Sequence, residues 1–233
     1  MTAVRAAPGA RPTGRKARPV SAHTAGMHTR RIVQLFTGLA LYGVSMALLI
    51  RSELGLDPWD VLHQGIAGRV GWSIGTVTIA LGAVVLLLWI PLRQRPGFGT
   101  LANVVVIGLA VDAALAVIPP VAGLPGRTAL LVGGIVLNAV ATGAYIGARM
   151  GPGPRDGLMT GVVGRTGWSV RGVRTAIEVT VLAAGWLLGG TVGIGTVAYA
   201  LAIGPLVHRL LPLLAIPDVD VVQDPVGTAA NRR

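Results

Sequence analysis

Among the ionisable side chains inside or beside the long apolar runs of this 233-residue sequence, five are candidates for a function: Asp60, His63, Arg155, Asp156 and Glu178. A carboxylate in or near a membrane is energetically costly, and for that reason it often has a function. His63 follows Asp60 by three residues, which on a helix places both side chains on one face and suits a proton relay. These residue types predict a pathway for a substrate, an ion or a proton.

Each of these residues also has a structural interpretation, which the sequence leaves open. Asp60 and Asp156 can accept hydrogen bonds from the free N–H groups of their own helix starts. A single histidine such as His63 commonly bonds a nearby carbonyl group. Glu178 follows Arg174 by four residues, and the two can form an ion pair that lets a weakly apolar helix insert.

Covalent catalysis and metal binding find little support in the sequence. A nucleophile and a base do not occur together at a recognisable spacing, so we expect that the protein is not an enzyme. The sequence has no cysteine, and no second set of ligands accompanies His63. We therefore expect neither a metal site nor a bound cofactor.

One stretch of the sequence occurs twice. Residues 54–73 and 150–169 align without a gap at an offset of 96, and ten of the twenty positions are identical. The Gly-x-Gly-Thr turns at 97–100 and 193–196 follow the same offset. This pattern indicates an internal duplication. Among the differing positions, Gly153 replaces Asp57, Arg155 replaces Trp59 and Met159 replaces His63.

Six long apolar segments follow a basic arm. Apolar residues make up 52% of the chain and charged residues 12%, which lies outside the range of ordinary soluble domains. Most segments approach the ~20 residues with which a helix crosses a bilayer. The fifth is short and carries Glu178. We therefore predict an all-α, polytopic membrane helix bundle. The segments are 32–50, 74–92, 101–118, 128–148, 173–188 and 196–214.

Two shorter helices are predicted in the duplicated stretches, from Pro58 and from Pro154. Each extends only ~18 Å, which is too short to cross a bilayer, so we predict re-entrant or interfacial helices. Proline suits the first helical position, and Asp57 suits the N-cap before Pro58. Small residues let membrane helices approach closely, and we expect such packing at four glycines. These are Gly65, Gly68, Gly161 and Gly164.

The basic residues predict the orientation of the chain. If six segments cross and the N-terminus is cytoplasmic, seventeen of the twenty basic residues lie inside and three outside. This agrees with the positive-inside rule, so we predict that both termini are cytoplasmic. Three crossings per copy then make the second copy inverted relative to the first. The expected parts are a disordered basic arm at 1–30, membrane repeats at 31–120 and 121–215, and a flexible tail at 216–233.

The string Leu54-Gly-Leu-Asp-Pro-Trp-Asp-Val-Leu-His63 resembles the bacterial YczE-like membrane proteins of the YczE/YyaS/YitT grouping. The strings Gly71-Trp-Ser-Ile-Gly-Thr76 and Pro96-Gly-Phe-Gly-Thr100 add to this resemblance, which runs from about residue 30 to 215. It implies a small multi-pass protein of the bacterial plasma membrane. It implies no substrate and no catalytic residue.

A small secondary transporter or permease, with a central site between the inverted copies, is the function that the sequence favours. Paired short helices rich in glycine and proline are typical of such sites. The alternative is a scaffold or accessory subunit that binds another membrane protein or a second copy of itself. The lipid bilayer and a small-molecule or ion substrate are the expected partners. Nucleic acid is not expected despite the net charge of +11, because the basic arm has no aromatic residue and orientation explains its charge.

Overall fold

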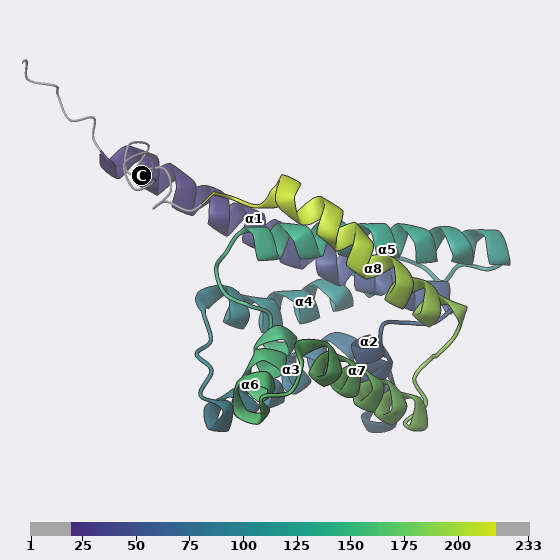
Figure 1. Ribbon diagram of the computed structural model, residues 1–233. Helices are drawn as coiled ribbons and strands as arrows, with labels where there is room; N and C mark the ends of the chain where they lie inside the picture. Colours follow the sequence, from purple (N-terminus) through teal and green to yellow (C-terminus); the bar gives the residue numbers. More distant parts are fainter. Residues whose placement is uncertain (1–19, 218–233) are drawn as a thin grey trace, which may run out of the picture.

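The computed structural model describes residues 20–217, with side chains from residue 26 onwards. In this part of the chain every regular element is an α-helix (Figure 1). The predicted all-α class is therefore confirmed. The helices are α1 (Val20–Ser52), α2 (Pro58–Val70), α3 (Ile74–Leu92), α4 (Phe98–Val117), α5 (Leu124–Gly147), α6 (Pro154–Thr166), α7 (Val170–Leu187) and α8 (Ile194–Leu214).

The long helices α1 and α5 pack along each other over much of their length. α4 packs on α1, and α8 packs on α5. In Figure 1, α1, α5 and α8 form an upper layer above α2, α3, α6 and α7. Glycines allow the close approach of the backbones. A Cβ atom on Gly38 would lie 2.8 Å from the amide nitrogen of Tyr145, and one on Gly43 would lie 2.8 Å from the carbonyl oxygen of Ile107.

Each of the two short helices packs mainly on a helix from the other half of the chain. α2 packs mainly on α7, and α6 packs mainly on α3. At the second contact the indole ring of Trp89 lies over Gly157, where a Cβ atom would overlap it. The indole N–H of Trp89 also donates a hydrogen bond to the carbonyl oxygen of Pro154, 3.1 Å away. Side-chain size and one hydrogen bond therefore fix the start of α6 against α3.

Helix bounds recur at the offset found in the sequence. α2 and α6 both contain 13 residues and begin 96 residues apart, at Pro58 and Pro154. α3 and α7 begin at equivalent residues, as do α4 and α8. Gly71 and Gly167 end the short helices with φ values of 75° and 69°, in the left-handed region that glycine enters without steric cost. The same local signals have thus produced the same elements twice.

Five helices are long and apolar enough to cross a bilayer, within the described residues. They are α1, α3, α4, α5 and α8. The fifth predicted segment, 173–188, corresponds to α7, an 18-residue helix that contains Arg171, Arg174 and Glu178. These charges lower its mean hydropathy, so a sixth crossing remains a prediction. The structure therefore has five helices that are suited to cross a bilayer, as a multi-pass membrane protein requires.

The predicted ends of the membrane unit need correction. α1 begins at Val20, so residues 20–30 are helical and do not belong to a disordered arm. At the other end, Ile216 is buried, and its amide donates to the carbonyl oxygen of Gly147, 3.0 Å away. Residue 216 therefore belongs to the bundle and not to the tail. The remainder of the predicted arm, 1–19, and of the tail, 218–233, lies outside the described residues.

Candidate functional site

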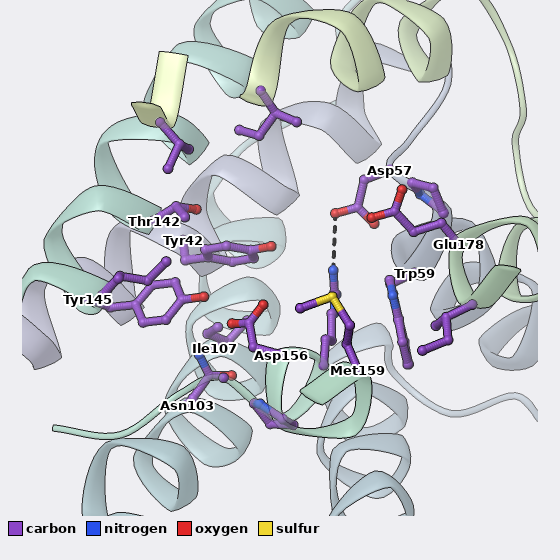
Figure 2. A pocket seen from close by; sticks show the side chains of 18 of the residues that line it. Tyr42, Asp57, Trp59, Asn103, Ile107, Thr142, Tyr145, Asp156, Met159 and Glu178 are labelled. Atoms are coloured by element: carbon purple, nitrogen blue, oxygen red, sulfur yellow. Dashed lines mark hydrogen bonds and ion pairs between the residues drawn. The ribbon is translucent and has the colours of Figure 1, made fainter. Parts of the chain in front are cut away.

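A cavity of about 650 Å³ lies between the two halves of the chain, and all eight helices contribute to its wall. This volume is in the range of small-molecule binding sites. The lining is mixed, with aliphatic side chains, three tyrosines and several charged groups. Figure 2 shows Tyr42 and Tyr145 on one side of the cavity and Asp57 and Trp59 on the other.

Charged groups from the two short helices meet in this cavity. Arg155, the second residue of α6, lies 3.5 Å from a carboxylate oxygen of Asp57 and 3.6 Å from one of Asp60. Its guanidinium also stands over the ring of Trp59, 5.0 Å from the ring centre. Both aspartates are 1% exposed. Two buried carboxylates therefore share one guanidinium, which leaves an excess negative charge when both are ionised.

Asp57 has two roles at the start of α2. One carboxylate oxygen accepts a hydrogen bond of 2.8 Å from the amide of Asp60, as the sequence predicts for an N-cap. The other oxygen faces Arg155 in the ion pair. Burial and the neighbouring carboxylate of Asp60 raise the pKa of Asp57, and Arg155 opposes this effect. Asp57 is thus a functional candidate that sequence reasoning had placed only among the helix-start residues.

His63 lies beside Asp60, with its Nδ1 atom 3.2 Å from a carboxylate oxygen. Burial, followed by the charge of Arg155, lowers the pKa of His63 to about 3, so its ring is neutral at ordinary pH. A neutral ring with its proton on Nδ1 donates to the Asp60 carboxylate. Burial raises the pKa of Asp60 to about 6. The pair has the arrangement of a proton relay with a buried acid that can change its charge near neutral pH.

The second oxygen of Asp60 has no hydrogen-bond partner among the described residues. A buried carboxylate oxygen without a partner is costly, because the group loses its hydration. Protonation removes part of that cost, which agrees with the raised pKa of Asp60. This unpaired oxygen distinguishes Asp60 from an aspartate that only stabilises a helix start.

Asp156 and Glu178 also line the cavity. Asp156 lies between Tyr145 and Met159 in Figure 2, and burial raises its pKa. Glu178 forms an ion pair of 3.0 Å with Arg174, as their spacing of four residues predicts. The side chain of Glu178 is 41% exposed. The structure therefore brings together Asp60, His63 and Arg155, and it places Asp156 and Glu178 on the wall of the same cavity.

The four glycines expected to permit close packing divide into two pairs. A Cβ atom on Gly65 would lie 2.5 Å from the carbonyl oxygen of Gly185, and one on Gly161 would lie 2.9 Å from the Cβ atom of Leu92. A Cβ atom on Gly68 or Gly164 would meet nothing within 4 Å. The prediction of close packing is wrong for these last two glycines, because they lie on the outer faces of α2 and α6.

Sequence reasoning missed a buried polar network beside the cavity. The hydroxyl of Tyr199 donates to Asn138 across 2.8 Å, and the amide of Asn138 donates to the hydroxyl of Ser45 across 2.9 Å. Asn138 and Ser45 are fully buried. This network connects α1, α5 and α8 behind the cavity wall. The available signal was Asn138 itself, an amide in the middle of an apolar segment.

The helices and the buried charges define a polytopic α-helical membrane protein with a cavity of mixed polar and apolar lining. Comparison with known proteins agrees with this class. Residues 29–212 match the family model described as a family of unknown function, DUF6198, and the chain belongs to this family. This match, together with the relatives YczE and YyaS described next, confirms the predicted resemblance to YczE-like proteins.

Three bacterial relatives match most of the chain. An uncharacterized protein of Haemophilus influenzae is 39% identical over 78% of this chain and 83% of its own length. The uncharacterized membrane protein YczE of Bacillus subtilis is 34% identical over 76% of this chain and 83% of its own length. The uncharacterized protein YyaS of the same bacterium is 24% identical over 76% and 90%. No solved structure matches.

Proposed function

We propose that this protein is a small secondary transporter or permease whose site lies between two inverted halves. The observation that carries the proposal is the meeting of Asp57 and Arg155 on the wall of a cavity of about 650 Å³, with the buried carboxylate of Asp60 3.6 Å from Arg155. Buried charges are costly in a membrane protein and are retained where they serve a substrate or ion pathway. A purely structural bundle has no need of two carboxylates with a single cation.

The repeated helices support an inverted arrangement. With three crossings in each half, α2 begins from one face of the membrane and α6 from the other. In many transporters, short helices in matching positions of the two halves place their N-termini at a central site. Movement of one half against the other then opens this site to each side of the membrane in turn. The crossed packing of α2 on α7 and of α6 on α3 fits this scheme, because movement of one half would move the opposite short helix.

The charge balance favours a cation or a proton-coupled substrate over an anion. Asp57 and Asp60 together exceed the charge of Arg155, and His63 is neutral. A cation or a proton entering the site would remove the excess negative charge. Asp60 and His63 are the residues that we assign to proton movement, and Asp57 and Asp60 to cation binding.

Reconstitution in liposomes tests this function. We would impose sodium, potassium or choline gradients and follow internal pH and tracer uptake. Asp57→Asn and Asp60→Asn should abolish a flux that the parent protein supports. Glu53→Gln is the matched control, because its exposed carboxylate pairs with Arg127 outside the cavity. Absence of any ion or metabolite flux in the parent protein, under every gradient, would contradict the proposal.

A scaffold or accessory subunit is the second candidate. In the most apolar 18-residue stretch of α8, only 6% is buried inside the protein, whereas 50% is buried in the corresponding stretches of α1 and α5. α8 therefore offers a large surface to another membrane helix. This function predicts a fixed partner, or a second copy, that co-purifies in mild detergent. Under it, Asp60→Asn would change stability without changing any flux.

A further inference from the structure

Two equivalent helix seams of this protein differ in how tightly they are closed. α3 packs closely on α4, where a Cβ atom on Gly82 would lie 3.4 Å from the Cβ atom of Val104. Asp112 of α4 reinforces this seam by accepting hydrogen bonds from the amide of Gly75, at 2.8 Å, and from the hydroxyl of Ser73, at 2.5 Å. The helices α3 and α4 thus form a sealed wall.

The corresponding seam between α7 and α8 is open. These two helices do not pack extensively on each other in the described chain. Gly204 stands where the first half has Gly108, and a Cβ atom on Gly204 would meet nothing within 4 Å. On Gly108 the same atom would lie 2.5 Å from Ile79. The close contact that α4 makes with α3 at Gly108 therefore has no counterpart between α8 and α7 at Gly204.

The most exposed residues of the cavity wall lie at this open seam. Four of the residues that line the cavity are exposed on the surface of the protein: Arg174, Ala200, Gly204 and His208. Arg174 belongs to α7, and the other three belong to α8. Their spacing of four residues places them on one face of α8. All three lie in the middle turns of a 21-residue helix, at the depth of the acyl chains if α8 crosses the bilayer.

We infer that the seam between α7 and α8 is a lateral opening through which an amphipathic organic cation enters the cavity from the bilayer. This inference rests on the proposed transport function and specifies its substrate class. The apolar body of the cation would lie against Ile177, Ile203 and Val207, which line the cavity next to the opening. Its charged group would reach Asp57 and, behind it, Asp60.

The cation specificity follows from the way in which Arg155 is held. Its distances of 3.5 and 3.6 Å to the two carboxylates exceed the ~2.7–2.9 Å of a tight charge-assisted hydrogen bond. Its side chain is 32% exposed, although both partners are buried. Arg155 therefore acts as a tethered cation that a ligand can displace from the carboxylates and from the face of Trp59. Removal of Arg155 should make the site more attractive to a cation.

Equilibrium binding in lipid nanodiscs tests the substrate class. Tetraphenylphosphonium and tetraphenylborate have nearly the same shape and opposite charge. The parent protein should bind the cation at least about tenfold more tightly than the anion. Asp57→Asn and Asp60→Asn should each weaken cation binding about tenfold or more, Glu53→Gln should leave it unchanged, and Arg155→Gln should strengthen it. Equal binding of both probes, or insensitivity to both asparagine variants, would overturn the inference.

Fluorescence quenching tests the route of entry. The parent chain has no cysteine, so Gly204→Cys offers a single site for a bimane label. Nitroxides on lipid acyl chains should quench the label at position 204 as strongly as one at position 201, where Leu201 is 73% exposed. A label at position 95, in the loop after α3, is the aqueous control. Tetraphenylphosphonium should reduce the lipid quenching at position 204 and leave position 201 unaffected.

The two tests separate this inference from the proposed function. Quenching at position 204 by aqueous iodide alone, or shielding of that position by a second copy of the chain, would overturn the lateral opening. Cation flux without lipid quenching would keep the transporter and remove the lateral route. Cation binding with lipid quenching but without flux would keep the inference and contradict transport. Size-exclusion profiles of each labelled variant show whether it retains the parent fold.

Discussion

The starts of α2 and α6 have the same backbone and different chemistry. Both helices begin with proline, carry an aspartate two residues later and end at a left-handed glycine. α2 presents Asp57 and Trp59, whereas α6 presents Gly153 and Arg155 at the equivalent positions. These side chains meet across the cavity as acid, aromatic ring and base. The repeated scaffold fixes where the helices begin, and divergence at two positions gives the site its charge.

A second difference between the short helices lies in the size of the residues at which they contact α3 and α7. On α6, Gly157 receives the large ring of Trp89 from α3. On α2, the residue equivalent to Gly157 is Val61, and the residue equivalent to Trp89 is Gly185 of α7, where an added Cβ atom would lie 2.5–2.6 Å from backbone atoms of Val61 and Leu62. Large and small residues have exchanged places between the two contacts. Each interface is therefore filled, although neither is a copy of the other.

We expect the largest loss of stability when the contact of α6 with α3 is given the residues found at the contact of α2 with α7. In Gly157→Val, the new side chain overlaps Trp89, so we expect a loss of about 3 kcal/mol or more in unfolding free energy, or no folded protein. The double variant Gly157→Val/Trp89→Gly recreates the arrangement of α2 and α7 and should recover part of the loss. Unfolding in detergent measures both. Additive effects of the two substitutions would show that the contacts are independent.

The second effect comes from removing the base that distinguishes α6 from α2. Arg155→Gln leaves Asp57 and Asp60 buried without a cation, and we expect a loss of about 2 kcal/mol at pH 8. The loss should shrink at pH 5, because protonated carboxyl groups need no counter-ion. Arg174→Gln is the control and should change stability by less than about 0.5 kcal/mol, since its pair with Glu178 is exposed. A loss that does not depend on pH would indicate a packing role for Arg155.

The third effect is the titration of Asp60. Burial raises its pKa from 3.8 to about 6, so in the native state this group binds a proton that the unfolded chain has already released. Its contribution to stability is therefore largest below pH 4 and is lost as the pH rises through about 6. The infrared band of the protonated carboxyl group should fall by half near pH 6 and be reduced in Asp60→Asn. A midpoint near pH 4 would show that Asp60 is hydrated and not buried.

Local signals predicted much of this fold. Asp57, Pro58 and Gly71 determine where α2 begins and ends, because capping and left-handed termination depend only on neighbouring residues. The contact between Asp57 and Arg155 joins residues 98 positions apart and depends on the meeting of two short helices, which no local pattern specifies. The open seam at Gly204 was also beyond prediction, since the duplication alone favours equal packing in both halves.

The smallest effect comes from the outward-facing glycines of the two short helices. Gly68 and Gly164 occupy equivalent positions, and a Cβ atom on either would meet nothing within 4 Å. Alanine at these helical positions should therefore raise the unfolding free energy by about 0.5–1 kcal/mol each, because it restricts the unfolded chain without a new contact. Gly65→Ala is the matched control and should destabilise, since its Cβ atom would lie 2.5 Å from the carbonyl oxygen of Gly185. Opposite signs at positions 65 and 68, one turn apart on α2, would show that only the inner face of this helix packs against α7. A destabilising Gly68→Ala or Gly164→Ala would instead place a partner helix against that outer face.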